Sequence, residues 1–173
     1  NLTAIFTVQP PNTYSLNLFS TPASAGTTSG AGSYLFNELT PVSATANTGY
    51  QFSHWSGNGV TDPSSDSTSV SMQQDINLTA QFSVKTYDLS ITSSTGGVTS
   101  GSGTYNHGSN PTISATPNSG YQFTKWSGAG VTDQNSSSTS ISMTQDRNLT
   151  AVFSLLTFNL TLNSSKGGTV SGG

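Results

Sequence analysis

The feature that most constrains this chain is an internal repeat with an offset of 71 residues. Residues 30–84 and 101–155 are identical at 32 of 55 aligned positions. The string Gly49–Phe52 recurs at 120–123, and the string Asn77–Ala80 recurs at 148–151. Because self-similarity at a fixed period is typical of repeat proteins, we interpret the chain as a tandem duplication of one structural unit.

The same alignment predicts where each unit begins and ends. Residues 14–86 form a first β repeat module and residues 87–157 a second. Residues 1–13 match the closing strand of a preceding repeat, and residues 158–173 match the opening segment of a third. We therefore expect this sequence to be a segment of a longer array of repeats. We also hypothesise that these terminal segments complete neighbouring modules, in the same chain or in identical chains, by strand addition.

Within one unit the apolar pattern is that of β-strands. Tyr87–Ile91 and Asn148–Phe153 alternate apolar with polar residues, and three further strand-like runs lie between them at 111–117, 121–126 and 138–143. Turns rich in Gly, Asn and Ser separate these runs. No stretch sustains the period of a helix, and at most one helical turn is expected, near Met143–Asp146. The sequence predicts a mainly β fold of small, sandwich-like tandem modules.

The composition excludes several classes of function. Lys and Arg number 4 and Asp and Glu 7, whereas Ser, Thr and Asn fill 73 of 173 positions. Four cations cannot neutralise a run of phosphates, so we expect no nucleic-acid partner. No stretch approaches the roughly 18 consecutive apolar residues of a membrane span, so no membrane insertion is expected. The absence of Cys excludes disulfides, thiolate zinc sites and thiol catalysis.

The order of motifs resembles a known family. Gly-Ser-Gly-x-Tyr at 101–105, Gly-Tyr-x-Phe-x-x-Trp-Ser-Gly at 49–57 and 120–128, and Asn-Leu-Thr-Ala-x-Phe at 77–82 and 148–153 are similar to motifs of the divergent InlB B-repeat family. The resemblance covers nearly the whole chain. It implies small β modules, related to the β-grasp arrangement, in stalks, adhesins and fibres of secreted and surface-anchored prokaryotic proteins. It implies no catalytic residues.

Three aspartates are weak candidates for a calcium site. Asp62 and Asp133 occupy the same place in Gly-x-Gly-Val-Thr-Asp, and Asp66 adds a carboxylate in the first repeat only, since Ser137 stands at the corresponding position. Calcium takes six to eight oxygen ligands, usually from several carboxylates. We therefore favour Asx-type turns, in which each Asp accepts hydrogen bonds from nearby backbone amides, with Ca²⁺ as the alternative. No other metal or cofactor is expected.

Trp55 and Trp126 have two alternative interpretations. An exposed indole stacks well on a sugar, which makes both residues candidate ligand platforms. Simple alternation from Phe123 directs Trp126 outward, but it also buries Lys125, and an unpaired buried Lys is costly. A β-bulge between Phe123 and Trp126 would direct the indole inward instead. Because so small a core needs its large rings, we favour burial of both tryptophans.

The remaining candidate residues concern modification and catalysis. Asn77 and Asn148 lie in Asn-Leu-Thr acceptor sequences for N-glycosylation, and alternation directs both side chains away from the buried Leu. His54 aligns with Lys125 and His107 with Phe36, so neither His recurs. A Ser–His–Asp arrangement would therefore be fortuitous, and we expect no enzyme activity.

Together these observations predict a non-enzymatic structural repeat at the cell surface or outside the cell. It would form part of a stalk, adhesin or fibre and act as a spacer, with self-assembly through its strands. The expected partners are adjacent repeats, identical chains and surface glycans. The alternative is a carbohydrate-binding module of a secreted enzyme or adhesin.

Overall fold

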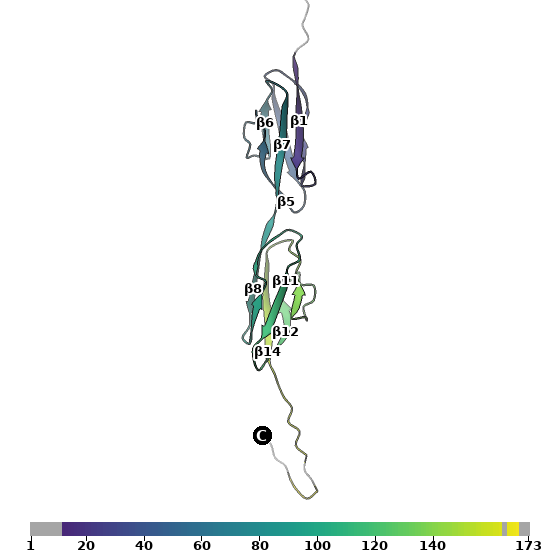
Figure 1. Cartoon of the computed structure of the whole chain (residues 1–173), viewed down its shortest axis with the longest axis vertical. Helices are drawn as coiled ribbons and strands as arrows, with labels where there is room; N and C mark the ends of the chain where they lie inside the picture. Colours follow the sequence, from purple (N-terminus) through teal and green to yellow (C-terminus); the bar gives the residue numbers. More distant parts are fainter. Residues whose placement is uncertain (1–11, 164–165, 170–173) are drawn as a thin grey trace, which may run out of the picture. The chain divides into compact units, whose positions relative to one another are not determined.

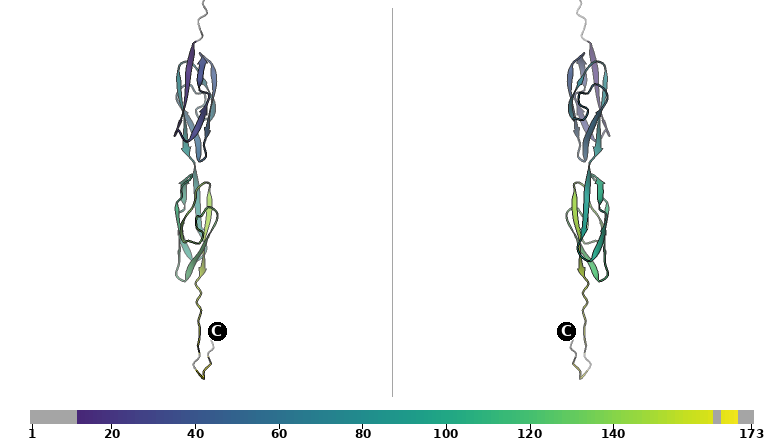
Figure 2. Two further views of the ribbon diagram at one scale, coloured as in Figure 1. Left: turned by 90° about the vertical axis from the view of Figure 1, so that its right-hand side faces the viewer. Right: turned by 90° about the vertical axis from the view of Figure 1, so that its left-hand side faces the viewer.

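The computed structural model describes residues 12–163 and 166–169, and every regular element among them is a β-strand. The chain divides into two compact units. The first extends to Thr86 and includes Asn106–Gly108, and the second comprises Tyr87–Tyr105 and the residues from Ser109 on. Figures 1 and 2 show strands as arrows in both units. The prediction of a mainly β fold is confirmed, and near residues 143–146, where one helical turn was allowed, the chain forms a bend at residues 144–145.

The first unit contains seven strands in two sheets. One sheet has the order β3-β1-β7-β5 and the other the order β2-β4-β6. Every neighbouring pair is antiparallel except β1 and β7, the first and last strands, which run parallel. The bounds are β1 Thr13–Thr21, β2 Gly26–Ser29, β3 Gly32–Leu35, β4 Leu39–Ala46, β5 Tyr50–Ser56, β6 Ser67–Ser71 and β7 Ile76–Val84.

The second unit repeats this topology strand for strand. Its sheets have the orders β10-β8-β14-β12 and β13-β11-β9, and its first and last strands, β8 and β14, are again parallel. The bounds are β8 Thr86–Ser93, β9 Gly97–Ser100, β10 Gly103–Asn106, β11 Thr112–Pro117, β12 Tyr121–Ser127, β13 Ser138–Ser140 and β14 Arg147–Leu155.

Apolar side chains from both sheets of a unit meet in one core. In the first unit, Leu16 and Leu78 from the larger sheet and Val42 and Val70 from the smaller one are all fully buried. The corresponding residues of the second unit are Leu89, Leu149, Ile113 and Ile141. Two sheets that face each other across a core make each unit a β-sandwich. No helix covers a sheet in the described chain, so the sandwich interpretation applies and the β-grasp one does not.

One glycine in each unit allows its two sheets to approach closely. A Cβ atom at Gly97 would overlap the ring of Phe153, and a Cβ atom at Gly26 would overlap the ring of Phe82. The first repeat departs from the second at Ala25, where the second has Gly96. Because Ala25 is itself fully buried, the change leaves the contact of Gly26 with Phe82 in place.

The connection between the two repeats is short. A single residue, Lys85, separates the end of β7 from the start of β8. No helix in the part of the chain that the structure describes is long and apolar enough to cross a membrane.

The structure describes only part of the predicted partial repeats, since residues 1–11, 164–165 and 170–173 lie outside the described residues. Residues 158–163 and 166–169 are described and form no strand. Phe158 is 88% and Leu160 82% exposed. In both complete units the matching strand, β1 or β8, pairs with two strands that follow it in the same repeat.

Candidate functional site

Both tryptophans are buried, as the sequence favoured, and the alternative of exposed ligand platforms is wrong. Trp55 is 2% and Trp126 0% exposed. In β12 the register shifts between Phe123 and Lys125, so Thr124 is the extra residue of a β-bulge. Trp126 then stands opposite Ala151, on the core side, while Lys125 is exposed. The predicted bulge is therefore confirmed, and the core covers the indole that a sugar would need.

Each indole also fastens the loop that follows its strand. Nε1 of Trp126 donates a hydrogen bond to the carbonyl oxygen of Ser136 (3.0 Å), and Nε1 of Trp55 donates to that of Ser65 (3.1 Å). The backbone N–H of Trp126 donates to the carbonyl oxygen of Gln134 (2.8 Å). These contacts recur in both repeats, so the tryptophans have a structural role.

Asp62 and Asp133 close short turns. Oδ1 of Asp62 accepts a hydrogen bond from the backbone N–H of Ser64, and Oδ1 of Asp133 accepts one from that of Asn135, both at 2.9 Å. These are the Asx-type turns that the sequence favoured. Asp66 is exposed, and its backbone carbonyl accepts from the N–H of Ala44 (2.8 Å). Among the described residues, no three His, Cys, Asp or Glu side chains gather into a metal-binding group.

A second recurrent pair of aspartates ties down the opening strands. Oδ1 of Asp75 accepts a hydrogen bond from the backbone N–H of Ser15 (2.7 Å), and Oδ1 of Asp146 accepts one from that of Asp88 (2.9 Å). Each carboxylate thus holds the beginning of β1 or β8 beside the closing strand of its own unit. Hydrogen bonds to a charged acceptor are among the stronger ones in proteins.

Asn77 and Asn148 are exposed on β7 and β14, as the alternation predicted. Oδ1 of Asn77 accepts a hydrogen bond from Nδ2 of Asn17 on the neighbouring strand (2.9 Å). Asn148 stands opposite Ser90 in the parallel register. Glycosylation of these two residues stays a prediction.

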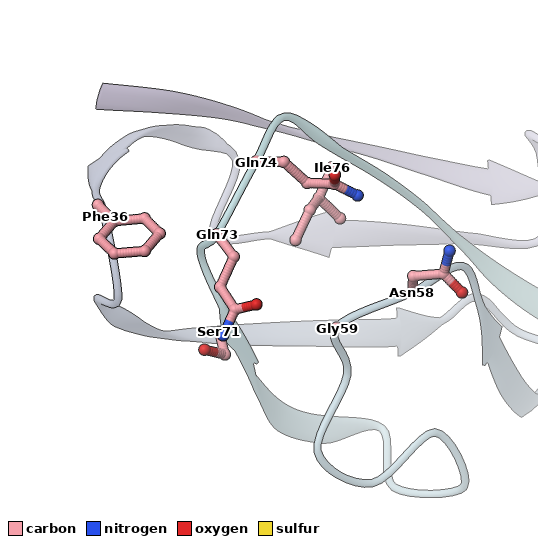
Figure 3. Close-up of a pocket in the computed structure, with 7 residues that line it drawn as sticks. All are labelled: Phe36, Asn58, Gly59, Ser71, Gln73, Gln74 and Ile76. Atoms are coloured by element: carbon pink, nitrogen blue, oxygen red, sulfur yellow. The ribbon is translucent and has the colours of Figure 1, made fainter. Parts of the chain in front are cut away.

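A hollow of about 390 Å³ opens on the first unit, where the β3–β4 turn, the β5–β6 loop and the β6–β7 turn meet. Figure 3 shows Phe36 and Asn58 at opposite sides of it, with Gln73 and Ile76 between them. Phe36 is 54% exposed, whereas Ile76 is only 6% exposed. The lining residues are Phe36, Asn58, Gly59, Ser71, Gln73, Gln74 and Ile76. The hollow therefore combines an aromatic ring and an apolar side chain with neutral amides and a hydroxyl.

Backbone hydrogen bonds fix the walls of this hollow. The N–H of Asn37 donates to the carbonyl oxygen of Met72 (2.7 Å), and the N–H of Met72 donates to that of Glu38 (3.0 Å). Asn37 has a φ of 63°, the left-handed conformation that Asn tolerates and that a tight turn needs. The ring of Phe36 packs against that of Tyr14, with centroids 6.2 Å apart. The hollow is thus largely preformed, as small-molecule sites usually are.

The second unit has a charged side chain at the place that corresponds to Ile76. Arg147 aligns with Ile76, and Gly130 aligns with Gly59. A Cβ atom at Gly130 would lie 2.9 Å from Cζ of Arg147, so the guanidinium covers this glycine. Nη2 of Arg147 donates to Oγ1 of Thr144 (3.2 Å), and Nε is buried.

Comparison with family models identifies what the two units have in common. The model of the divergent InlB B-repeat domain matches residues 16–86 and 87–156, one match for each seven-stranded unit. The chain belongs to the divergent InlB B-repeat family. InlB B-repeats are generally structural modules, associated with surface or secreted proteins. Comparison with curated proteins and with solved structures gave no match.

The residues around the hollow were not predicted from the sequence. A signal for them exists in the differences between the two InlB B-repeats. Four lining positions carry different residues in the second repeat, namely Phe36 against His107, Asn58 against Ala129, Gln73 against Thr144 and Ile76 against Arg147. These positions are scattered over a repeat, and only the pairing of its strands brings them together.

Proposed function

We propose that this chain is a non-enzymatic extracellular spacer, part of a stalk, adhesin or fibre built from InlB B-repeats. The observation that carries the proposal is the role of the residues that recur. Trp126 fastens a loop, Asp133 closes a turn and Asp146 holds the opening strand, each through contacts within its own unit. Because the residues that recur stabilise the repeat itself, an array of such repeats is suited to span a distance and to display the parts of the protein that it carries.

The joint between the repeats supports the same function. With only Lys85 between β7 and β8, few backbone dihedrals are free to change the orientation of one repeat against the next. A spacer needs this restriction, because a flexible chain of the same length explores a wide range of end-to-end distances.

Electron spin resonance can test the spacer proposal directly. Thr27 and Val98 are exposed residues at matching positions of the two repeats, and the chain has no native Cys to interfere. Spin labels on Thr27→Cys and Val98→Cys should give a narrow distribution of distances. Insertion of four glycines after Lys85 should broaden it. Equally broad distributions with and without the insertion would overturn the proposal.

Uncharged sheet edges support association between chains. The smaller sheet of the first unit ends in β2, with the sequence Gly-Thr-Thr-Ser, and β6, with the sequence Ser-Thr-Ser-Val-Ser. Neither carries the Lys or Pro that commonly protects an exposed edge. Sedimentation velocity should show species larger than the 17.8 kDa chain at high concentration, and Thr27→Lys with Ser67→Lys should reduce them. A monomer at every concentration would contradict self-assembly.

A further inference from the structure

The hollow of the first unit carries chemistry that a spacer does not use. We propose that it binds a neutral saccharide of one or two sugar rings. This site is separate from the two buried tryptophans, and the proposal does not depend on the spacer function.

The lining residues have the chemistry that a sugar requires. The ring of Phe36 is more than half exposed and offers an apolar face to the C–H groups of a pyranose. The amides of Asn58 and Gln73 and the hydroxyl of Ser71 are both donors and acceptors of hydrogen bonds. Sugar hydroxyls have the same double character, so one set of neutral groups serves several of them at once.

The charges near the hollow disfavour an anionic ligand. None of the seven lining residues is charged. The nearest ionisable groups in the sequence are the carboxylates of Glu38 and Asp75, which accept hydrogen bonds from the backbone N–H groups of Leu35 (2.8 Å) and Ser15 (2.7 Å). An anionic ligand would therefore lose hydration without gaining an opposite charge, which is costly.

The size of the hollow limits the ligand. Its volume of about 390 Å³ lies at the lower end of the range of roughly 300–1,000 Å³ that is typical of small-molecule sites. One or two rings fit this space, with Phe36 at one side and Asn58 at the other (Figure 3).

The second repeat provides an internal control. The guanidinium of Arg147 lies over Gly130, whereas the apolar side chain of Ile76 lies over Gly59. Ala129 and Thr144 replace the two amide side chains, Asn58 and Gln73. The second repeat thus lacks the two amides and carries a charged group in place of an apolar one, so binding should be confined to the first.

A titration of the ¹⁵N-labelled full chain, followed by NMR, tests the site. The probes are cellobiose, maltose, lactose and N,N′-diacetylchitobiose, with glucuronic acid as the charged comparison. At least one neutral disaccharide should shift the backbone amides of Gly59, Ser71 and Gln73. The amides of the matching residues, Gly130, Ser142 and Thr144, should stay in place.

Substitutions then locate the binding groups. Phe36→Ala should weaken binding at least tenfold, and Ile76→Arg should abolish it, because the substitution brings a long charged side chain, as in the second repeat, into the lining of the hollow. The pair Asn58→Ala and Gln73→Thr introduces residues that the second repeat already uses, so this variant should fold and bind more weakly.

Three results would each overturn the proposal. The first is the absence of shifts with all four neutral sugars up to their solubility limits. The second is a correctly folded Phe36→Ala chain that binds as strongly as the unchanged one. The third is tighter binding of glucuronic acid than of every neutral sugar, which would exclude a neutral ligand class.

Discussion

Trp126 donates its indole N–H to the carbonyl oxygen of Ser136 at 3.0 Å, across the loop that leads from β12 to β13. Trp55 and Ser65 make the same contact in the first repeat at 3.1 Å. A buried Trp with its polar atom satisfied contributes a large apolar surface to the core and also fixes the loop above it. The most conspicuous aromatic of the repeat is thus a structural anchor.

Replacing this anchor should destabilise one unit and leave the other unchanged. Trp126→Ala should lower the free energy of unfolding of the second unit by about 3–5 kcal/mol, the usual cost of removing a buried large aromatic. The remaining Trp55 then reports the first unit alone in urea unfolding followed by fluorescence, while calorimetry records both units. Trp55→Ala is the matched control and should destabilise the first unit while leaving the second unchanged. An unchanged melting transition of the second unit in calorimetry of Trp126→Ala would contradict the anchoring role.

Removing one buried hydroxyl should stabilise the first unit. Thr40 is 1% exposed, and its Oγ1 has no hydrogen-bond partner among the described residues. Thr40→Val keeps the shape and removes the unsatisfied group, so we expect a gain of about 1 kcal/mol. That gain raises the melting temperature of a unit of this size by about 4–8 °C. Calorimetry measures it, with the exposed Thr27→Val as control, and a lower melting temperature of Thr40→Val would show that the hydroxyl is satisfied.

The contribution to stability of the carboxylate that holds the opening strand should also be measurable. Asp75→Ala removes the acceptor of the Ser15 N–H and should cost about 1 kcal/mol of the stability of the first unit. Asp75→Asn keeps an oxygen acceptor without the charge and should cost less. Hydrogen exchange of the Ser15 amide should accelerate more in Asp75→Ala than in Asp75→Asn. Equal exchange rates in all three chains would mean that this bond does not protect β1.

The close approach of the two sheets in each unit leads to a further prediction about stability. Gly97→Ala places a methyl group where the ring of Phe153 lies, and such overpacking typically costs about 1–3 kcal/mol. Gly108→Ala is a suitable control, because a Cβ atom there meets nothing within 4 Å, although its φ of 78° adds some strain. Calorimetry should show a larger loss of stability for Gly97→Ala than for Gly108→Ala. A loss for Gly97→Ala no greater than that for Gly108→Ala would argue against tight packing of the two sheets.

The local features of the fold follow well from the sequence. Alternation predicted strands at β8, β12 and β14, and the conflict between Lys125 and Trp126 predicted the bulge, which the structure places at Thr124. The tendency of Asp to accept hydrogen bonds from nearby backbone amides predicted the turns at Asp62 and Asp133. Each of these inferences depends on residues a few positions apart, where steric and hydrogen-bonding preferences act directly.

The candidate site could not be predicted in the same way. The sequence offered Trp55 and Trp126 as sugar platforms only as the alternative to burial, and the core covers both. Phe36, Asn58 and Ile76 gave no local signal, because each is unremarkable within its own segment. They line one hollow only because three separate turns converge on it.

By itself, the sequence determined that this protein is a tandem array of β modules with few charged residues and with buried aromatics, because repeat spacing and period-two alternation can be read from the order of neighbouring residues. The tertiary structure decided that the first and last strands of a repeat lie parallel and adjacent, with Leu16 opposite Ile76. It also decided that Phe36, Asn58 and Ile76, which lie far apart in the sequence, line one hollow. The physical reason is that strand pairing and packing join residues up to 60 positions apart, and no local preference specifies which of many such pairings buries the most apolar surface.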